Sequence, residues 1–453
     1  MASFSAAVLS EITGGVWLNN LMPSGELSVS TDTRTDNRGM IFFALSGENF
    51  DAHNFLEQAV SSGCQAVCIK REKQRCAPEN IPVLLVEDPL RAMQKCAEFH
   101  RLRFPELTLL GVTGSVGKTS VKEMLRAICI RQAGKTAVLA TSGNTNNQIG
   151  VAMNLLKLDH NHRYAVIEAG TSSPGEIAPL SRMMHPSGAI VNSIAPCHLE
   201  QLIDLNGVAA EKGNLFRFMP EYAPAVFPAD TAGKDLLKKA ADKYRTVTFG
   251  LNDDGDISAV FKGGDLAGSS FDLKFPDGRI FNIRWHLTGM HNALNAAGAA
   301  ALAYAVGIEP EVIAEGLPET SLPGMRMKKT VVSGITYFND AYNANPASMH
   351  ASVNLLASAP PSGRLIMVLG GMRELGETSL AEHRRLLDEI REKLPDATLI
   401  CIGKEFAGLS GNHFFSAGEA GVFLTEMLRP GDTVFAKGSR GNAVEKALPP
   451  EAR

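Results

Sequence analysis

The chain has 453 residues, which at roughly 150 residues per domain predicts about three domains. Lys plus Arg number 44 against 48 Asp plus Glu, and 45% of the residues are hydrophobic. This balance argues against a disordered chain and against a large basic surface, so we expect no nucleic-acid partner.

The apolar stretches favour a chain without a membrane span. The longest, around residues 293–308, is shorter than the roughly 18 residues that a spanning helix needs, and it is interrupted by Asn295, Tyr304 and two glycines. Residues 1–15 lack the basic start and the long apolar run of a signal peptide. We therefore expect a cytoplasmic protein, and we interpret its seven cysteines, which form no C-x-x-C pair, as reduced packing residues.

Residues 1–106 are predicted to form a small α/β domain. Short β-like runs occur at 65–70 and 83–86. An amphipathic segment at 91–101 follows them and suits a helix.

From residue 107 onward, short apolar runs alternate with helical segments. The predicted strands are 107–112, 136–140, 164–169, 188–192 and 224–227, and the predicted helices are 118–131, 148–156, 175–183, 207–219 and 232–242. Such alternation implies a parallel sheet with helices on both faces. A sheet of this kind binds ligands at the carboxyl ends of its strands.

The rest of the chain predicts an appendage and a second α/β unit. Polar–apolar alternation at 257–285 suggests antiparallel strands, and an Ala-rich helix at 290–306 returns to the sheet. A Pro-, Gly- and Ser-containing break at 317–324 precedes the second unit. Its predicted strands lie near 328–338, 364–369, 398–402 and 432–436, and its helices near 346–357, 380–393 and 418–428. We predict three domains, 1–106, 107–320 and 321–453.

The strongest local signal is GVTGSVGKTS, residues 111–120, between a predicted strand and a predicted helix. Glycines let backbone N–H groups close around phosphate oxygens, Lys118 supplies a positive charge, and the Thr119 hydroxyl can bind Mg²⁺. Val112 stands where the full P-loop pattern has its first glycine, so this is a G-x-x-G-K-T variant. The nucleotide-binding residues predicted here are Gly114, Ser115, Val116, Gly117, Lys118, Thr119 and Ser120.

Other polar side chains follow the predicted strands. Glu168 ends a buried-looking strand, where a carboxylate needs a cation. His198 follows the next strand, and Lys212 lies on the helix after it. The segment 141–151 places Thr141, Asn144, Asn146 and Asn147 directly after a strand. Each alone suits a turn or a core, but their shared position at strand ends favours a site.

These residues resemble the Mur ligase family of peptidoglycan synthesis in the G-x-x-G-K-T loop, the strand-end Glu, the His and the helical Lys. Segments 339–349 and 368–386 resemble the member that adds D-alanyl-D-alanine. Segments 30–67 and 432–448 are similar to its two ends, so that the resemblance covers nearly the whole chain.

The resemblance implies a fold and a reaction. It implies a small N-terminal α/β domain for the uridine diphosphate end of the substrate, a central P-loop ATPase with a mostly parallel sheet, and a Rossmann-like C-terminal α/β domain. The implied enzyme uses ATP and Mg²⁺ to form an acyl phosphate on UDP-N-acetylmuramoyl-tripeptide, which the amine of D-alanyl-D-alanine then attacks. We expect it to act as a monomer.

The resemblance also implies residue roles. Thr119 and Glu168 would hold one Mg²⁺, and His198 and Lys212 a second, with the lysine as a carbamate, because an ammonium would repel the metal. Lys118 and Arg326 would face phosphate. Asn292 and Asn295 would contact adenine, Asp340 ribose, and Tyr342, Asn343 and Asn345 the nucleotide and acceptor cleft, while Asp32, Thr33, Arg34, Asp51 and His53 match the uridine-side segment.

Some positions depart from the family pattern, and rival readings remain. Thr171, Ser172, Asn339 and Gly371 replace the usual Ala, Asn, Asp and Asp. The rivals are the sister ligase that adds the third residue, a folylpolyglutamate synthetase, and a non-catalytic nucleotide switch or scaffold. The segment YNANP at 342–346 argues against the sister ligase, and the segment 30–67 argues against the folylpolyglutamate synthetase. The presence together of Lys118, Glu168, His198 and Lys212 argues against a non-catalytic switch or scaffold.

Overall fold

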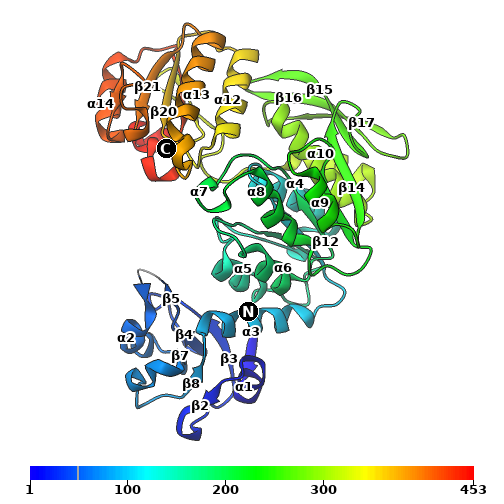
Figure 1. The fold of residues 1–453 in the computed structure, drawn as a ribbon, viewed down its shortest axis with the longest axis vertical. Coiled ribbons are helices and arrows are strands. Elements are labelled where there is room, and N and C mark those ends of the chain that lie inside the picture. Colours follow the sequence, from blue (N-terminus) through cyan, green and yellow to red (C-terminus); the bar gives the residue numbers. More distant parts are fainter. Residues whose placement is uncertain (48–49) are drawn as a thin grey trace.

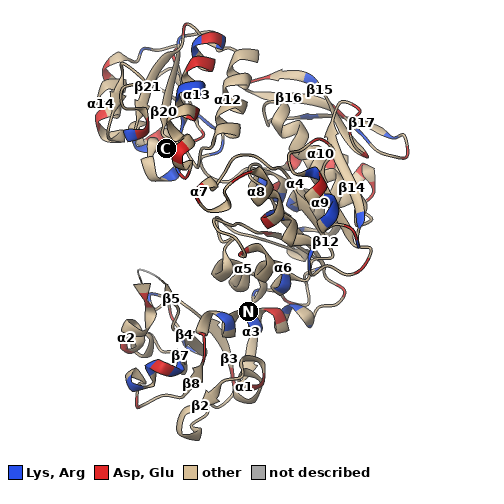
Figure 2. Ribbon diagram, viewed as in Figure 1, with Lys and Arg blue, Asp and Glu red and all other residues tan. Residues whose placement is uncertain are grey.

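The structure is a computed structural model of the chain, and it describes residues 1–47 and 50–453. Three large sheets follow one another along the sequence, and Figure 1 shows them spaced along the long axis, with the first and third at opposite ends. The predicted α/β fold class is confirmed. Figure 2 shows Lys and Arg interspersed with Asp and Glu over all three parts.

The first sheet has six strands in the order β1-β3-β4-β7-β8-β2. They are β1 (Ser3–Ser5), β2 (Val16–Trp17), β3 (Glu26–Ser30), β4 (Met40–Phe43), β7 (Ala66–Lys70) and β8 (Val83–Val86), with helices α1 (Ala6–Thr13), α2 (Leu56–Ser61) and α3 (Pro89–Leu102) and a small hairpin of β5 (Ser46–Gly47) and β6 (Phe50–Asp51). The strands predicted at 65–70 and 83–86 are confirmed as β7 and β8.

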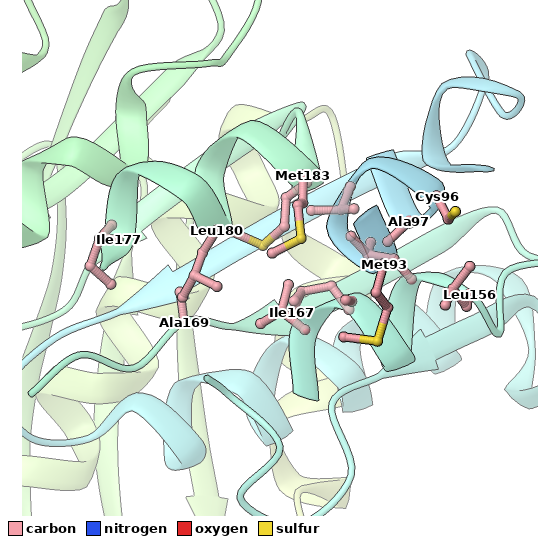
Figure 3. Close-up of a cluster of buried hydrophobic side chains, with 14 of the residues drawn as sticks. Met93, Cys96, Ala97, Leu156, Ile167, Ala169, Ile177, Leu180 and Met183 are labelled. Atoms are coloured by element: carbon pink, nitrogen blue, oxygen red, sulfur yellow. The ribbon is translucent and has the colours of Figure 1, made fainter. Parts of the chain in front are cut away.

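Helix α3 joins the first sheet to the second. Asp88 caps its N-terminus by accepting hydrogen bonds from the backbone of Leu90 and Arg91, with Pro89 at the first turn. Its buried face carries Met93 and Cys96, which belong to one hydrophobic cluster with residues of both sheets. Figure 3 shows these two side chains with Ile167, Leu180 and others from the second part of the chain. Because the buried face of α3 contacts apolar residues of the first and the second sheet, the two sheets share part of one hydrophobic core.

The second sheet has nine strands in the order β10-β11-β9-β12-β13-β14-β15-β16-β17. They are β9 (Thr108–Thr113), β10 (Val138–Ala140), β11 (Tyr164–Glu168), β12 (Gly188–Val191), β13 (Pro224–Pro228), β14 (Arg245–Leu251), β15 (Ile257–Asp265), β16 (Gly268–Lys274) and β17 (Ile280–Trp285). The helices are α4 (Lys118–Ala133), α5 (Gln148–Leu155), α6 (Ile177–Met184), α7 (Leu199–Leu202), α8 (Leu205–Gly213), α9 (Lys234–Ala240), α10 (Met290–Ala305) and α11 (Pro310–Gly316).

The antiparallel strands predicted at 257–285 as an appendage are β15, β16 and β17, and they continue the central sheet at one end. Strand β14, which was not predicted, pairs in parallel with both β13 and β15 and so bridges the two regions. Its first residues, Arg245 and Thr246, are exposed and polar, so it has no long apolar run. The Ala-rich helix α10 packs closely on this sheet, since a side chain at Gly298 would collide with Phe249 and Ile190.

The third sheet has six strands in the order β18-β19-β23-β20-β21-β22. They are β18 (Lys328–Val332), β19 (Ile335–Asn339), β20 (Leu365–Gly370), β21 (Thr398–Ile402), β22 (His413–Phe414) and β23 (Thr433–Lys437), with helices α12 (Pro346–Ser358), α13 (Ser379–Lys393) and α14 (Ala417–Met427). The segment 328–338 is an antiparallel hairpin, and the other pairings are parallel.

Among the described helices, none is long and apolar enough to cross a membrane. Six cysteines are buried and Cys76 is exposed, so the interpretation as packing residues is wrong for Cys76. The strands of the three sheets fall within residues 3–86, 108–285 and 328–437, while the exact domain limits stay predictions.

Candidate active site

A loop suited to phosphate connects β9 to α4. The strand ends at Thr113, and the helix begins at Lys118 with Gly117 as its N-cap in a left-handed conformation, φ 80°. Only glycine fits there, because a side chain would collide with the amides of Asn192 and Asn295. Free N–H groups of the first helical turn and the positive end of the helix dipole therefore face this loop, as an anion site requires.

The segment after β12, residues 192–195, fixes the shape of the loop. Ser115 donates from its backbone nitrogen to the carbonyl of Ser193 at 2.9 Å and from Oγ to the carbonyl of Ala195 at 2.9 Å. The backbone nitrogen of Val116 donates to Oγ of Ser193 at 2.9 Å. A loop held in this way loses less entropy when it binds a phosphate.

The ammonium of Lys118 lies against the loop. Its Nζ donates to the carbonyl oxygen of Gly114 at 2.8 Å and to that of Ser115 at 3.4 Å. Both partners are neutral, so the positive charge is not cancelled by them. It is therefore available to a phosphate group in the loop.

Glu168 lies buried at the carboxyl end of β11, 1% exposed. Its Oε2 accepts a hydrogen bond from Oγ1 of Thr119 at 2.9 Å, and its Oε1 accepts one from Nδ2 of Asn146 at 2.8 Å. Its backbone nitrogen donates to Oγ1 of Thr141 at 2.9 Å. These partners are neutral, and a buried carboxylate is costly without a cation, so this corner suits a divalent metal.

Arg326 approaches the same corner from the segment that precedes the third sheet. Its Nη2 donates to Oγ1 of Thr119 at 3.1 Å. Its guanidinium carbon lies 3.7 Å from the centre of the Tyr342 ring. A fixed guanidinium beside the loop is suited to phosphate oxygens.

His198 follows β12 and caps the short helix α7 in a left-handed conformation, φ 53°. Its Nδ1 lies 2.5 Å from Oε2 of Glu374, which belongs to the third sheet's part of the chain. The contact lowers the pKa of the Glu374 carboxyl. His198 thus lies where the second and third parts of the molecule meet.

Lys212 is buried on α8, 1% exposed. Burial, with a smaller contribution from the charge of Lys118, lowers its pKa to about 8. Within the described part of the chain, its ammonium has neither a hydrogen bond nor an ion pair. At pH 7 this pKa leaves roughly a tenth of the amines neutral, against fewer than about one in a thousand for an ordinary lysine.

A cleft of about 630 Å³ opens between the second and third sheets' parts of the chain. It brings together many of the residues predicted from the sequence. Those that line it are Ser115, Val116, Gly117, Lys118, Thr119, Ser120, Asn144, Asn146, Asn147, Glu168, His198, Asn292, Asn295, Arg326, Asp340, Tyr342, Asn343 and Asn345. The lining does not include Gly114, Thr141, Lys212 or the predicted residues of the first sheet, as far as the chain is described.

The predicted nucleoside contacts are already hydrogen-bonded to the protein. Asp340 forms an ion pair with Lys437 at 2.5 Å. Asn295 accepts a hydrogen bond from Asn192 at 2.8 Å, and Asn292 donates to the carbonyl oxygen of Thr288 at 2.9 Å. Their roles toward adenine and ribose stay predictions, which require these amides and this carboxylate to exchange or share partners.

Two of the predicted asparagines have clear structural functions. Asn147 caps α5 by accepting from the backbone of Gly150 at 2.8 Å, and Asn345 caps α12 by accepting from that of Ser348 at 2.9 Å. Asn144 accepts a hydrogen bond from Asn146 at 3.3 Å. Because both caps occur at the cleft, these residues orient its walls, and direct substrate contact stays a prediction.

The residues predicted for the uridine side lie in the N-terminal part of the chain, in the segment after β3 and in and after β6. Arg34 pairs with Asp32 at 2.7 Å and lowers its pKa to about 2, and Thr33 lies between them in the chain. Nδ1 of His53 lies 2.6 Å from Asp51, and its Nε2 accepts from the backbone of Lys70 at 3.1 Å. Asp51 and His53 therefore fix the hairpin to the sheet.

Cleft residues that the sequence analysis missed include Asn192, Ser193, His291 and Lys437. Burial lowers the pKa of His291 to about 4, and the charge of Asp340 opposes this only in part. Asn192 ends the predicted strand 188–192 and Ser193 follows it, so the strand-end rule could have found them. Lys437 directly follows the predicted strand 432–436 and carries the same signal, whereas His291 carries none, because only the fold brings it beside Asp340.

Comparisons with known proteins agree with this geometry. Residues 112–303 match the Mur ligase middle domain, and residues 325–440 match the Mur ligase glutamate ligase domain. The chain is 35% identical over 433 residues to the UDP-N-acetylmuramoyl-tripeptide–D-alanyl-D-alanine ligase of Haemophilus influenzae, covering 93% of this chain and 92% of that protein. The chain belongs to the Mur ligase family.

Other Mur ligases are similar to this chain over nearly its whole length. The Escherichia coli protein with the same name as the Haemophilus one is 35% identical over 430 residues, covering 93% of this chain and 92% of that protein. The crystal structure of MurF from Acinetobacter baumannii superposes with a TM-score of 0.91 at 31% identity, covering 99% of this chain and 98% of that chain.

The structure explains three of the departures from the usual Mur ligase pattern. A side chain at Gly371 would collide with Glu405, so the Asp expected there has no room. Asn339 donates from Nδ2 to the carbonyl oxygen of Ala452 at 3.3 Å, which an Asp carboxylate could not do. Thr171 donates from Oγ1 to the carboxylate of Glu176 at 3.1 Å. The same carboxylate accepts from the backbone nitrogen of Ser172 at 2.7 Å and so closes the loop of residues 171–176.

Proposed function

We propose that this Mur ligase joins D-alanyl-D-alanine to UDP-N-acetylmuramoyl-tripeptide at the expense of ATP, in the synthesis of peptidoglycan precursors. The observation that carries the proposal is the cleft in which Lys118, Thr119, Glu168 and Arg326 meet beside a loop shaped for phosphate. Full-length similarity to ligases of this name supports the same activity.

The proposed reaction has two chemical steps. The terminal carboxylate of the tripeptide attacks the γ-phosphorus of ATP, the bond to ADP breaks, and an acyl phosphate forms. The amine of D-alanyl-D-alanine then attacks the acyl carbon, inorganic phosphate leaves, and the nitrogen loses a proton to give the amide. Lys118, Arg326 and the N–H groups of the loop would hold the phosphate oxygens and stabilise their charge as it moves.

Magnesium fits the corner formed by Thr119 and Glu168. The hydroxyl and the buried carboxylate are hard oxygen ligands, and Glu168 has only neutral protein partners. The described residues contain no group of three His, Cys, Asp or Glu side chains that could hold a metal. This suits Mg²⁺, which protein sites commonly hold with one or two carboxylates plus substrate phosphates and water. Bound there, it would neutralise charge on the transferring phosphoryl group.

Lys212 and His198 are the proposed ligands of a second metal. A buried lysine with a pKa of about 8 has a usable fraction of neutral amine. That amine can attack the carbon of CO₂, forming an N–C bond and releasing a proton. The resulting carbamate is anionic and offers two oxygens, whereas the ammonium would repel a cation.

Substrate binding and location complete the proposal. The residues Asp32, Thr33, Arg34, Asp51 and His53 would hold the uridine end of the substrate, and the three predicted domains would bring it to the cleft. We place the enzyme in the cytoplasm, because the reaction needs a compartment that holds ATP. A monomeric state stays a prediction.

Release of phosphate from ATP tests the proposal. We expect turnover only when Mg²⁺, UDP-N-acetylmuramoyl-tripeptide and D-alanyl-D-alanine are all present, because the acyl phosphate is useful only with an amine in place. Omission of each component in turn provides the controls. Robust turnover with free D-alanine, with the dipeptide precursor and a diamino acid, or with folate and glutamate would refute the assignment and identify the rival ligase.

A further inference from the structure

Glu374 crosses from the third sheet's part of the chain to the metal side of the cleft. It lies in the segment between β20 and α13, and its Oε2 is 2.5 Å from Nδ1 of His198. A side chain at Gly376 would come within 3.3 Å of Glu200 on α7, so the loop that carries Glu374 and the loop that leads through His198 into α7 also approach each other beyond this pair. The contact therefore belongs to a local interface between the two loops.

The backbone on both sides of Glu374 is fixed by contacts with the rest of the C-terminal part. The backbone nitrogen of Met372 donates to Nε2 of His383 at 2.8 Å, and that of Arg373 donates to Oγ of Ser439 at 3.0 Å. Leu375 is buried on the other side. Glu374 itself has a left-handed backbone, φ 63°, which is uncommon for a residue with a side chain and is found more often where function demands it.

His198, the partner of Glu374, likewise has an uncommon backbone conformation. His198 also has a left-handed backbone, φ 53°, and its ring lines the cleft. Its Nδ1 is a buried atom without an aligned hydrogen bond from or to the described residues, although the Glu374 carboxylate is within reach. Buried polar nitrogens of this kind are normally bonded, and the Glu374 carboxylate is the acceptor within reach.

We propose that Glu374 is a positioning residue for His198. It accepts a hydrogen bond from Nδ1–H and so fixes the tautomer in which Nε2 carries the lone pair that would face a divalent metal in the cleft. Histidines that bind metals almost always donate their other ring nitrogen to a carboxylate or carbonyl, which orients the ring and raises its basicity. The proposal rests on the proposed function, since that function assigns His198 to a metal.

This arrangement makes the metal site depend on two domains. His198 comes from the central part of the chain, whereas Glu374 comes from the C-terminal part. Docking of the C-terminal part would therefore complete the site by orienting a ligand that it does not itself contain. The exposed Glu377, three residues later in the same segment, provides a matched control, because the structure gives it no ion pair among the described residues.

The first experiment needs no metal. Two-dimensional ¹H–¹⁵N NMR of the full-length, ¹⁵N-histidine-labelled protein reports the tautomer of each ring, and His198→Ala identifies the signal of His198. We expect the Nδ1–H form in the wild type and in Glu377→Gln. In Glu374→Ala we expect a mixture of tautomers, and Glu374→Gln should restore the Nδ1–H form in part, since its amide oxygen can still accept. An unchanged tautomer in Glu374→Ala would overturn the proposal.

The second experiment measures binding of Mn²⁺ alone by the EPR signal of the free ion. Loss of an outer carboxylate typically weakens metal binding by about 10–100-fold, so we expect at least a roughly tenfold weaker site in Glu374→Ala and little change in Glu377→Gln. If His198→Ala weakens binding but Glu374→Ala does not, the positioning role is wrong and the metal role survives. If neither variant weakens binding, both roles are wrong.

A tighter site in Glu374→Ala would also overturn the proposal, because it would make the carboxylate a competitor for the imidazole. The thermal unfolding midpoint of every variant serves as the control for correct folding. Because the Glu374 side chain is 55% exposed, its replacement should leave that midpoint nearly unchanged.

Discussion

Arg326 stacks on Tyr342, with its guanidinium carbon 3.7 Å from the centre of the phenol ring. The same guanidinium donates to Thr119, the first hydroxyl of α4. The aromatic ring comes from the third sheet's part of the chain and the hydroxyl from the second. The arginine is therefore oriented toward the phosphate loop by contacts on both sides of the cleft.

Replacement of Tyr342 should separate stacking from hydrogen bonding. A cation–π contact of this kind contributes about 0.5–2 kcal/mol, so Tyr342→Ala should lower kcat/KM for ATP by roughly 2- to 30-fold. Tyr342→Phe keeps the ring and should remain close to the wild type. Steady-state kinetics with all three substrates gives both values. Equal losses in the two variants would mean that the hydroxyl, rather than the ring, matters.

The loop prediction can be tested at Lys118. Its ammonium donates to two loop carbonyls and lies at the loop predicted to bind phosphate. Groups that stabilise charge in a transition state are worth roughly 100-fold or more in rate, so Lys118→Ala should lose at least that factor in kcat at saturating ATP. Near wild-type turnover would show that this lysine does not face the transferring group.

The sequence was most informative where the physical signal is local. The phosphate loop could be predicted because glycines, a lysine and a threonine lie side by side between a strand and a helix. The strands predicted at 65–70 and 83–86 contain the apolar runs 66–69 and 83–86, and the structure places β7 and β8 there. Strand β14 was missed because its first residues are exposed and polar.

The rest of the site depends on contacts between distant parts of the chain. Glu374 and His198 are 176 positions apart and meet only in the fold. Lys437 lies beside Asp340 for the same reason, since β23 pairs with β19. Likewise, the sequence did not show that Asn147 and Asn345 cap helices, because the same residues suit turns, caps and substrate contacts.

Closure of the molecule should involve its parts unequally. The first two sheets share a hydrophobic cluster through α3, where Met93 and Cys96 are fully buried. The third sheet has separate clusters and meets the cleft through polar contacts such as that of His198 with Glu374. Interfaces of the second kind open more readily.

We therefore expect small-angle scattering to show compaction when nucleotide and UDP-tripeptide are added together. Amide hydrogen exchange in α3 should change little, while that of residues 372–378 should slow as the loop is fixed. Addition of the nucleotide alone provides the control. An unchanged radius of gyration with both ligands present would count against closure.

Burial of Lys212 predicts a dependence of stability on pH. Its pKa is lowered to about 8 in the folded protein, against about 10.4 in an unfolded chain. Between these values the unfolded state binds more protons, so the stability contributed by this residue rises with pH over that window. In CO₂-depleted buffer, Lys212→Met should be more stable than the wild type at pH 7, and the difference should shrink toward pH 10. Urea unfolding at several pH values measures it, and a constant difference would contradict the shifted pKa.

Activity gives the complementary test at Lys212. The amine is fully buried without a charged partner in the described structure, so its replacement by Ala leaves a small space beside the predicted second metal site. If the carbamate is the working form, Lys212→Ala should lose most activity, because the metal loses an anionic oxygen ligand. Short carboxylic acids such as acetate can occupy the space and supply that oxygen, so they should restore part of the rate in a saturable way.

The same acids added to Lys118→Ala should have no effect, because that variant lacks a cation and not an oxygen ligand. Full activity of Lys212→Ala without any additive would refute the role.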